Sequence, residues 1–516
     1  MATDTPRSAA SNKPTDDTRR LHELGYAQEL ARRMSGFSNF AVSFTIISIL
    51  SGCLTLYGYG MSTGGPAAIN IGWPLVGIMV TLVGLAMAEI CSSYPTAGGL
   101  YYWSAKLAQT NGPIWSWYTG WFNLIGQVGI TAGIDFGLAL FVTAFLNLTI
   151  DVPATPGLTV GVYAVVLFAH GLLNTFGVRL VALLNDISVW WHVIGVAVIV
   201  AALSFVPAHH QPMSFVFFHS VNQTGWGSGG YVFLLGLLLA QYTFTGYDAS
   251  AHMTEETHDA AVTGPRGIVL SIVVSLIAGW VLLVGVTAAI QDYDQELGSA
   301  TGVPPVQIFL DAVGRTGGLL LLVIVIGAQF FCGMSSVTAN SRMIYAFSRD
   351  GALPGSNFWH RINRRTRTPT NSIWLAAVAA FILGIPYLWS ATAYAAITSI
   401  AVIGLYIAYI IPVYLRLKVG DQFQRGPWHL GRWSRPIGIV TVIWVIFICL
   451  LFILPPVSPV TVNSFNYAPV AVLTVLAFAG AYWLVSARRW FTGPKVQGTV
   501  EELAEIEREL TMVSAE

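Results

Sequence analysis

The sequence predicts an all-α protein that crosses a membrane about twelve times. Of its 516 residues, 54% are hydrophobic and only 10% are charged, whereas charged residues make up roughly 25% of an ordinary soluble domain. The charges are also clustered, and no charged residue occurs between Arg435 and Arg488. A membrane helix needs about 20 mostly apolar residues, so this stretch holds two. The composition therefore excludes a soluble enzyme, a nucleic-acid-binding protein and a disordered chain.

The apolar stretches place the membrane helices in chain order. We expect spans at 38–62, 70–91, 115–146, 157–175, 184–206, 229–250, 266–290, 318–345, 372–388, 391–415, 437–455 and 467–486. An even number of spans places both termini on one side of the membrane. If that side is the cytosol, every one of the 25 Lys and Arg residues except Arg315 falls on it. The positive-inside rule therefore predicts cytosolic termini.

Two of these spans contain polar and glycine-rich sequence in their middle. These are residues 47–53 (ISILSGC) and residues 242–248 (YTFTGYD). A helix broken at such a point presents N–H groups at one half-helix and C=O groups at the other, which suit a carboxylate and an ammonium group. Both charges of a zwitterion could then be bound without charged side chains. Gly, Ser and Thr are also common in unbroken membrane helices, which is the alternative at each place.

The positions of the two interruptions, five spans apart, predict an internal repeat. We expect two inverted five-helix repeats followed by two added helices. The resulting divisions are an N-terminal cytosolic tail 1–36, a transporter domain 37–486 (first repeat 37–206, second repeat 229–415, last two helices 437–486) and a C-terminal cytosolic tail 487–516.

Four longer motifs carry a family resemblance. They are residues 37–41 (FSNFA), 88–103 (AEICSSYPTAGGLYYW), 246–257 (GYDASAHMTEET) and 348–354 (SRDGALP). Together they resemble the amino acid–polyamine–organocation superfamily, in particular its amino acid/choline transporter branch, which includes GABA and amino acid permeases. The resemblance implies a secondary active transporter of the plasma membrane that works by alternating access, with an amino acid or GABA as substrate.

The resemblance also implies which residues bind the substrate. They are Ser48, Ser51, Gly52, Tyr242, Thr245 and Gly246. In the family, the first break holds the substrate carboxylate, the backbone of the second break receives the amine, and an aromatic side chain at the position of Tyr242 packs on the substrate. This sequence departs from the Gly-Ser-Gly pattern of the first break because it has Leu50 as the first residue of that triplet.

Three ionisable residues are candidates for coupling transport to protons. Asp135 lies midway along its span, where a carboxylate costs at least a few kcal/mol unless it is paired or protonated. It is predicted to carry a proton or to face the substrate amine; the alternative is a protonated acid bonded to a neighbouring helix. His192 falls near a Lys that helps coupling in some family members, although an interfacial histidine between aromatic residues is the alternative. Asp248 is the acidic residue after the second break.

Further acids near the cytosolic ends of the spans are candidates for ion pairs. Glu255 and Glu256 could form a gate with Arg179, Arg266 or Arg342, or they could be solvated.

Proton-coupled import is the first prediction, and exchange or a choline or polyamine permease is the alternative. A sensor built on the same fold is the non-transport alternative. We expect no enzyme, because the Gly-x-Ser-x-Gly pattern at residues 60–64 lacks the strand–turn–helix context of a hydrolase. We also expect no cofactor and no metal site, and the four cysteines lie in apolar spans without metal-ligand spacing. The expected partners are the substrate, protons and the lipid bilayer, with no nucleic acid.

Overall fold

The computed structural model describes residues 16–176, 178–363, 365–390, 393–462 and 464–515, and within these ranges it contains helices and no strand. Eleven of the helices are long and apolar enough to cross a membrane, and Gly229–Thr243 forms a shorter apolar segment. The prediction of an all-α polytopic membrane protein is therefore confirmed. Residues 1–15 of the expected N-terminal tail lie outside the described residues.

The observed helices follow the expected spans closely. They are α2 to α4 (Gly36–Ile47, Ile49–Thr55, Tyr57–Ser62), α6 (Gly72–Ser93), α8 (Gly112–Ile150), α9 (Pro156–Phe176), α10 (Val178–Phe205), α12 to α14 (Gly229–Gly236, Leu238–Thr243, Ala249–His252), α15 (Ala260–Ala288), α17 (Pro304–Arg349), α19 (Thr370–Gly384), α20 (Ala393–Val419), α21 (Ser434–Ile453) and α22 (Ala468–Val485). One difference is that α17 begins well before residue 318. Its first part is a separate helical stretch, since Gly314 has φ 74° and bends the chain there.

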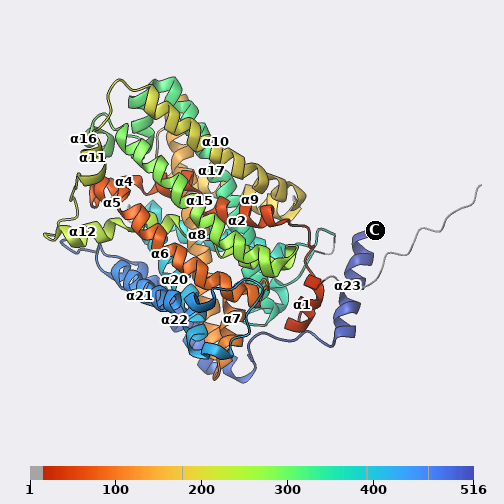
Figure 1. The fold of residues 1–516 in the computed structure, drawn as a ribbon. Coiled ribbons are helices and arrows are strands. Elements are labelled where there is room, and N and C mark those ends of the chain that lie inside the picture. The colour runs from red at the N-terminus through yellow and green to blue at the C-terminus, as the bar shows by residue number, and fades with distance from the viewer. Residues whose placement is uncertain (1–15, 177, 364, 391–392, 463, 516) are drawn as a thin grey trace, which may run out of the picture.

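Shorter helices lie at the two ends of the bundle (Figure 1). One end carries α1 (Asp16–Leu24), α7 (Gly99–Leu107) and the last helix, α23 (Val500–Ala515). We call it the basic end, because the expected topology assigns nearly all Lys and Arg residues to it. The opposite end carries α5 (Gly65–Asn70), α11 (Met213–Phe218) and α16 (Tyr293–Leu297), and we call it the far end.

The bundle is built around α8, which packs against α9, α17 and α20, while α2 packs against α10, α15 and α17. The outer surface is apolar: Ile277, Ile443 and Leu473 are each more than 60% exposed. Such a surface suits lipid, which competes for no hydrogen bonds. Polar side chains are instead gathered between the central helices, and they form the candidate site.

Candidate functional site

The first helix break lies at Ser48. This residue has φ 30° and ψ 86°, a left-handed conformation that ends α2 at Ile47 and lets α3 begin at Ile49. The break therefore falls before the predicted Leu50-Ser51-Gly52 triplet. Ser51 and Gly52 lie in the first turn of α3, and their N–H groups donate to the Ser48 carbonyl at 2.8 and 3.0 Å. The N–H groups without a helical partner are thus those at the very start of α3.

The second break covers the five residues between Thr243 at the end of α13 and Ala249 at the start of α14. Gly246 has φ 87°, a conformation that an L side chain rarely adopts. The Phe244 carbonyl accepts a hydrogen bond from the Tyr406 hydroxyl at 2.8 Å, and the Thr245 hydroxyl donates to the Tyr242 carbonyl at 2.6 Å. The chain at this point presents backbone carbonyls that the helix does not use.

The two breaks, about 200 residues apart in sequence, are in direct contact. A Cβ atom on Gly52 would lie 2.5 Å from Thr243 Oγ1, and a Cβ atom on Gly246 would overlap the Ile46 side chain. Only glycine lets the backbones approach so closely. The free N–H end of α3 and the carbonyl end of α13 therefore meet inside the protein.

This meeting point is closed to solvent. Ser48 and Thr245 are fully buried, and Ser51 and Tyr242 are each 2% exposed. The Tyr242 hydroxyl points at Gly133 of α8 and has no hydrogen-bond partner among the described residues. A buried hydroxyl without a partner costs about 1–3 kcal/mol. It is a donor and acceptor available to a ligand held at the breaks.

His192 lies directly beside the first break. Its Nδ1 is 2.8 Å from the Ser188 carbonyl, which only accepts, so Nδ1 carries the proton in this arrangement. Its Nε2 is 2.7 Å from Ser48 Oγ, and in the neutral tautomer the Ser48 hydroxyl donates to it. The imidazole is fully buried and packs edge-on against Phe44.

Asp248 is held by neutral donors from two other helices. The Tyr409 hydroxyl donates to Oδ1 at 2.7 Å and the Gln127 amide donates to Oδ2 at 2.7 Å. His252 Nε2 lies 3.2 Å from the same Oδ2. Three side chains from α8, α14 and α20 therefore meet at this carboxyl group.

Asp135 has a different environment and a partner that the sequence did not reveal. His170 Nδ1 of α9 lies 3.1 Å from Asp135 Oδ1, and both side chains are fully buried. Apart from this contact, neither the carboxylate oxygens nor the ring nitrogens have a hydrogen-bond partner among the described residues. His170 belongs to an otherwise uncharged span, which is the same signal that singled out Asp135.

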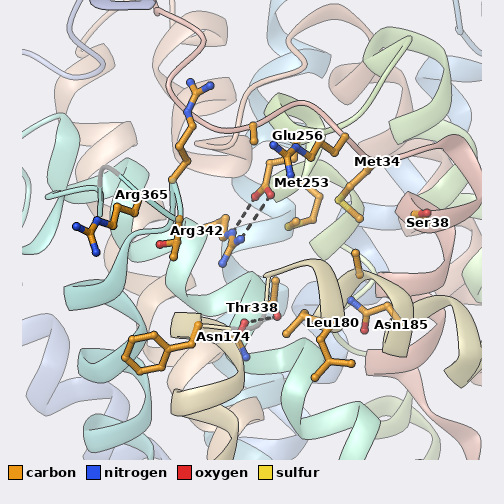
Figure 2. Close-up of a pocket in the computed structure, with 17 residues that line it drawn as sticks. Met34, Ser38, Asn174, Leu180, Asn185, Met253, Glu256, Thr338, Arg342 and Arg365 are labelled. Atoms are coloured by element: carbon orange, nitrogen blue, oxygen red, sulfur yellow. Dashed lines mark hydrogen bonds and ion pairs between the residues drawn. The ribbon is translucent and has the colours of Figure 1, made fainter. Parts of the chain in front are cut away.

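A cavity of about 790 Å³ opens at the basic end, away from the two breaks. Figure 2 shows its walls, which come from the segment before α2, from α9, α10 and α17, from the 3-10 helix η1 (Thr254–Glu256) and from the loop at residues 365–367. Arg342 of α17 pairs with Glu256 at 2.8 Å on one wall, and the Thr338 hydroxyl donates to Asn174 Oδ1 at 2.6 Å on another.

Two other acids at this end are also paired. Glu255 contacts Arg349 at 3.1 Å, and Glu89 of α6 lies 3.5 Å from Arg416. Of the gate partners considered from the sequence, Arg342 is the one in contact with Glu256, and the side chain of Arg179 lies outside the described residues.

Comparison with known proteins decides the family. The model of a family described as amino acid permease matches residues 34–478. The chain belongs to the amino acid permease family. It is 46% identical over 496 residues to the amino-acid permease BAT1 of Arabidopsis thaliana, which covers 92% of this chain and 95% of that protein.

Two further relatives align with this chain over most of its length. The homologue of BAT1 in Oryza sativa subsp. japonica is 44% identical over 92% of this chain and 95% of its own length. The GABA-specific permease of Saccharomyces cerevisiae is 32% identical over 93% of this chain and 86% of its own length. The resemblance drawn from the four sequence motifs is thereby confirmed.

Proposed function

We propose that the protein is a secondary active transporter that moves amino acids or GABA across the membrane by alternating access. The observation that carries this proposal is the buried contact between the two helix breaks at Gly52 and Gly246. Broken helices that meet in a closed central site are the device by which transporters bind charged substrates without charged side chains. Relatives named as an amino-acid permease and as a GABA-specific permease support the substrate class. Transport, and not catalysis, is then the activity.

Each end of the substrate has a matching group at the breaks. The unpartnered N–H groups at the start of α3 and the hydroxyls of Ser48 and Ser51 bind the carboxylate, because a helix N-terminus carries a partial positive charge, and Gly52 leaves room for it. The backbone carbonyls at Thr245 and Gly246 bind the amine. The Tyr242 hydroxyl, unpartnered in the closed site, completes the contact.

Proton coupling would involve the Ser48–His192 contact. In the neutral state the Ser48 hydroxyl donates to His192 Nε2. Protonation of Nε2 makes the imidazole a donor at both nitrogens, so the Ser48 hydroxyl proton is released to turn toward the substrate carboxylate. A proton on His192 therefore strengthens substrate binding. Asp135 and Asp248 are the other two coupling residues of the proposal.

The basic end is proposed to face the cytosol, which places both termini there, in the plasma membrane. The cavity lined by Glu256 and Arg342 would then be the inner vestibule of the transport path. In this arrangement residues 37–206 and 229–415 are the two inverted repeats, and residues 437–486 add the last two helices.

Uptake into proteoliposomes tests the proposal. The purified full-length chain is reconstituted and offered radiolabelled GABA, alanine, arginine and glutamate, with and without an inward proton gradient. Accumulation driven by the gradient supports proton symport, whereas counterflow without such accumulation supports the exchanger alternative. A protein that binds a labelled amino acid but moves none in either assay would be a sensor, and the transport proposal would fail.

A further inference from the structure

Asp135 differs from Asp248 in that, among the described residues, its carboxylate contacts one polar side chain, His170, and accepts no other hydrogen bond. Asp248 receives hydrogen bonds from Tyr409 and Gln127. Asp135 has only the His170 ring at 3.1 Å. Its carboxylate also packs directly against Gly333 of α17, where any side chain would overlap it.

The total charge of this pair depends on one proton. With the proton present the pair is neutral, whether it is written as a carboxylic acid beside imidazole or as a carboxylate beside imidazolium. Without that proton the pair carries a net negative charge in a closed apolar site, which costs several kcal/mol. Loss of that proton therefore requires water to reach the pair.

The surrounding groups do not compensate for that charge. The titratable side chains near Asp135 are Tyr163 of α9, Tyr242 of α13, Cys332 of α17 and Tyr394 of α20. All are uncharged at neutral pH. Among the described residues, no second ion pair involves Asp135 or His170.

Asn174 and Thr338 form a layer of side chains on the wall of the basic-end cavity, next to the pair. Asn174 lines that cavity and lies one helical turn from His170, whose carbonyl accepts from its Nδ2 at 3.0 Å. The same Nδ2 donates to the carbonyl of Met334, next to Gly333, at 3.1 Å. Thr338 closes the layer through its 2.6 Å hydrogen bond to Asn174 Oδ1, as Figure 2 shows. Parting of α9 and α17 at this bond would admit water to the pair.

We propose that Asp135 and His170 together bind the transported proton and release it into the basic-end cavity when the Asn174–Thr338 layer opens. The proton arrives from the far end, is held on the pair in the closed state and leaves to the cavity, with no other bond changed. This inference rests on the proposed transport function and adds a second proton site, which carries the proton across, to the Ser48–His192 contact, which senses it at the substrate.

The test compares two assays on the full-length protein in proteoliposomes, with radiolabelled GABA and alanine as probes. Asp135→Asn and His170→Asn are expected to lose accumulation driven by a proton gradient, while counterflow, which needs no net proton movement, is kept. Tyr163→Phe is the matched control, because it removes a buried polar contact on α9, the bond to the Ala380 carbonyl, without removing a group that titrates near neutral pH. It should keep both activities.

The two assays separate the possible failures. If both Asn variants accumulate the probes under the gradient as the wild type does, the pair is not the proton site. If the wild type shows counterflow without gradient-driven accumulation, the pair has no proton to carry and the inference is wrong while transport stands. If the wild type shows neither activity, the transport function itself fails, and the inference fails with it.

A conservative variant keeps the proposal testable if the Asn variants fold poorly. Asp135→Glu keeps the carboxyl group but moves it by one methylene, so it should keep gradient-driven accumulation and shift the pH of half-maximal uptake. An unchanged pH midpoint would contradict the proposal.

Discussion

The Nε2 atom of His192 lies 2.7 Å from Ser48 Oγ, so α10 is bonded directly to the residue at which the first transmembrane helix breaks. Ser48 holds a left-handed conformation that serine rarely adopts. One hydrogen bond therefore joins a titratable ring to the backbone turn that exposes the N–H groups of α3.

Loss of this bond should uncouple uptake from pH. Ser48→Ala leaves His192 Nε2 buried without a partner, at a cost of about 1–3 kcal/mol. We expect Ser48→Ala and His192→Asn each to flatten the pH profile of uptake. The double variant should lose no more pH dependence than the more affected single variant. Thr45→Val is the control, since Thr45 donates to Ser188 across the same two helices. Additive losses in the double variant would show that the two residues act separately.

Gly246 is predicted to tolerate no side chain. Its φ of 87° and the Ile46 side chain both oppose a Cβ atom, and overpacking alone costs about 1–3 kcal/mol. Gly246→Ala should lower the melting temperature and abolish uptake. Gly161→Ala, on α9 with no atom within 4 Å of the new Cβ, should leave both unchanged. Normal transport by Gly246→Ala would mean that the breaks can separate.

A smaller residue at position 243 should partly offset a larger residue at position 52, because the two residues are in contact. Gly52→Ala places a Cβ atom 2.5 Å from Thr243 Oγ1 and should reduce uptake strongly. Thr243→Ala removes Oγ1 and Cγ2 but leaves Cβ 2.8 Å from the new atom, and it loses the bond to the Leu239 carbonyl. The double variant should recover part of the uptake lost in Gly52→Ala. If it recovers none, the damage lies elsewhere than in this contact.

The Glu256–Arg342 pair should stabilise the closed basic end. Arg342 is 3% exposed and Glu256 is 7% exposed, and removing one partner of a buried pair costs about 3–5 kcal/mol. Glu256→Gln and Arg342→Gln should each lower the melting temperature. The exchanged pair, Glu256→Arg with Arg342→Glu, should restore part of the loss. If the single variants melt at the same temperature as the wild type, the pair does not stabilise the closed basic end.

At the far end, Glu296 of α16 should make stability depend on pH. Burial raises the pKa of this carboxyl to about 7, from an ordinary value of 4.5. The folded state thus binds a proton that the unfolded state has released, so stability falls as the pH rises from 4.5 to about 7 and is level above it. Glu296→Gln should flatten this slope in tryptophan-fluorescence melting curves. Asp294→Asn, an exposed acid on the same helix, should not.

The helices were predictable from sequence because membrane spans depend on length and apolar composition, which a single sequence contains. The exact position of the first break was not predictable. Its sequence signal was Ser51-Gly52, whereas the chain turns at Ser48, where contacts from α10 support a conformation that the residue does not prefer by itself.

The sequence singled out ionisable candidates such as Asp135, but not the contacts between them. Asp135 and His170 each stand out as ionisable groups in apolar spans, yet their contact depends on how α8 and α9 are rotated about their axes. Both α8 and α9 have apolar residues on nearly every side, and so their sequences do not fix that rotation. The cavity at the basic end likewise depends on several separate segments meeting.

The two ends of the described chain are joined to each other. The backbone N–H of Gln28 donates to Glu507 of α23, a residue 479 positions later, and His22 contacts the same carboxylate at 2.8 Å. A ribosome has to make all the intervening helices before this contact can form. The basic end is therefore completed only after residue 507 has been made, and a chain truncated before α23 lacks this contact with its first segment.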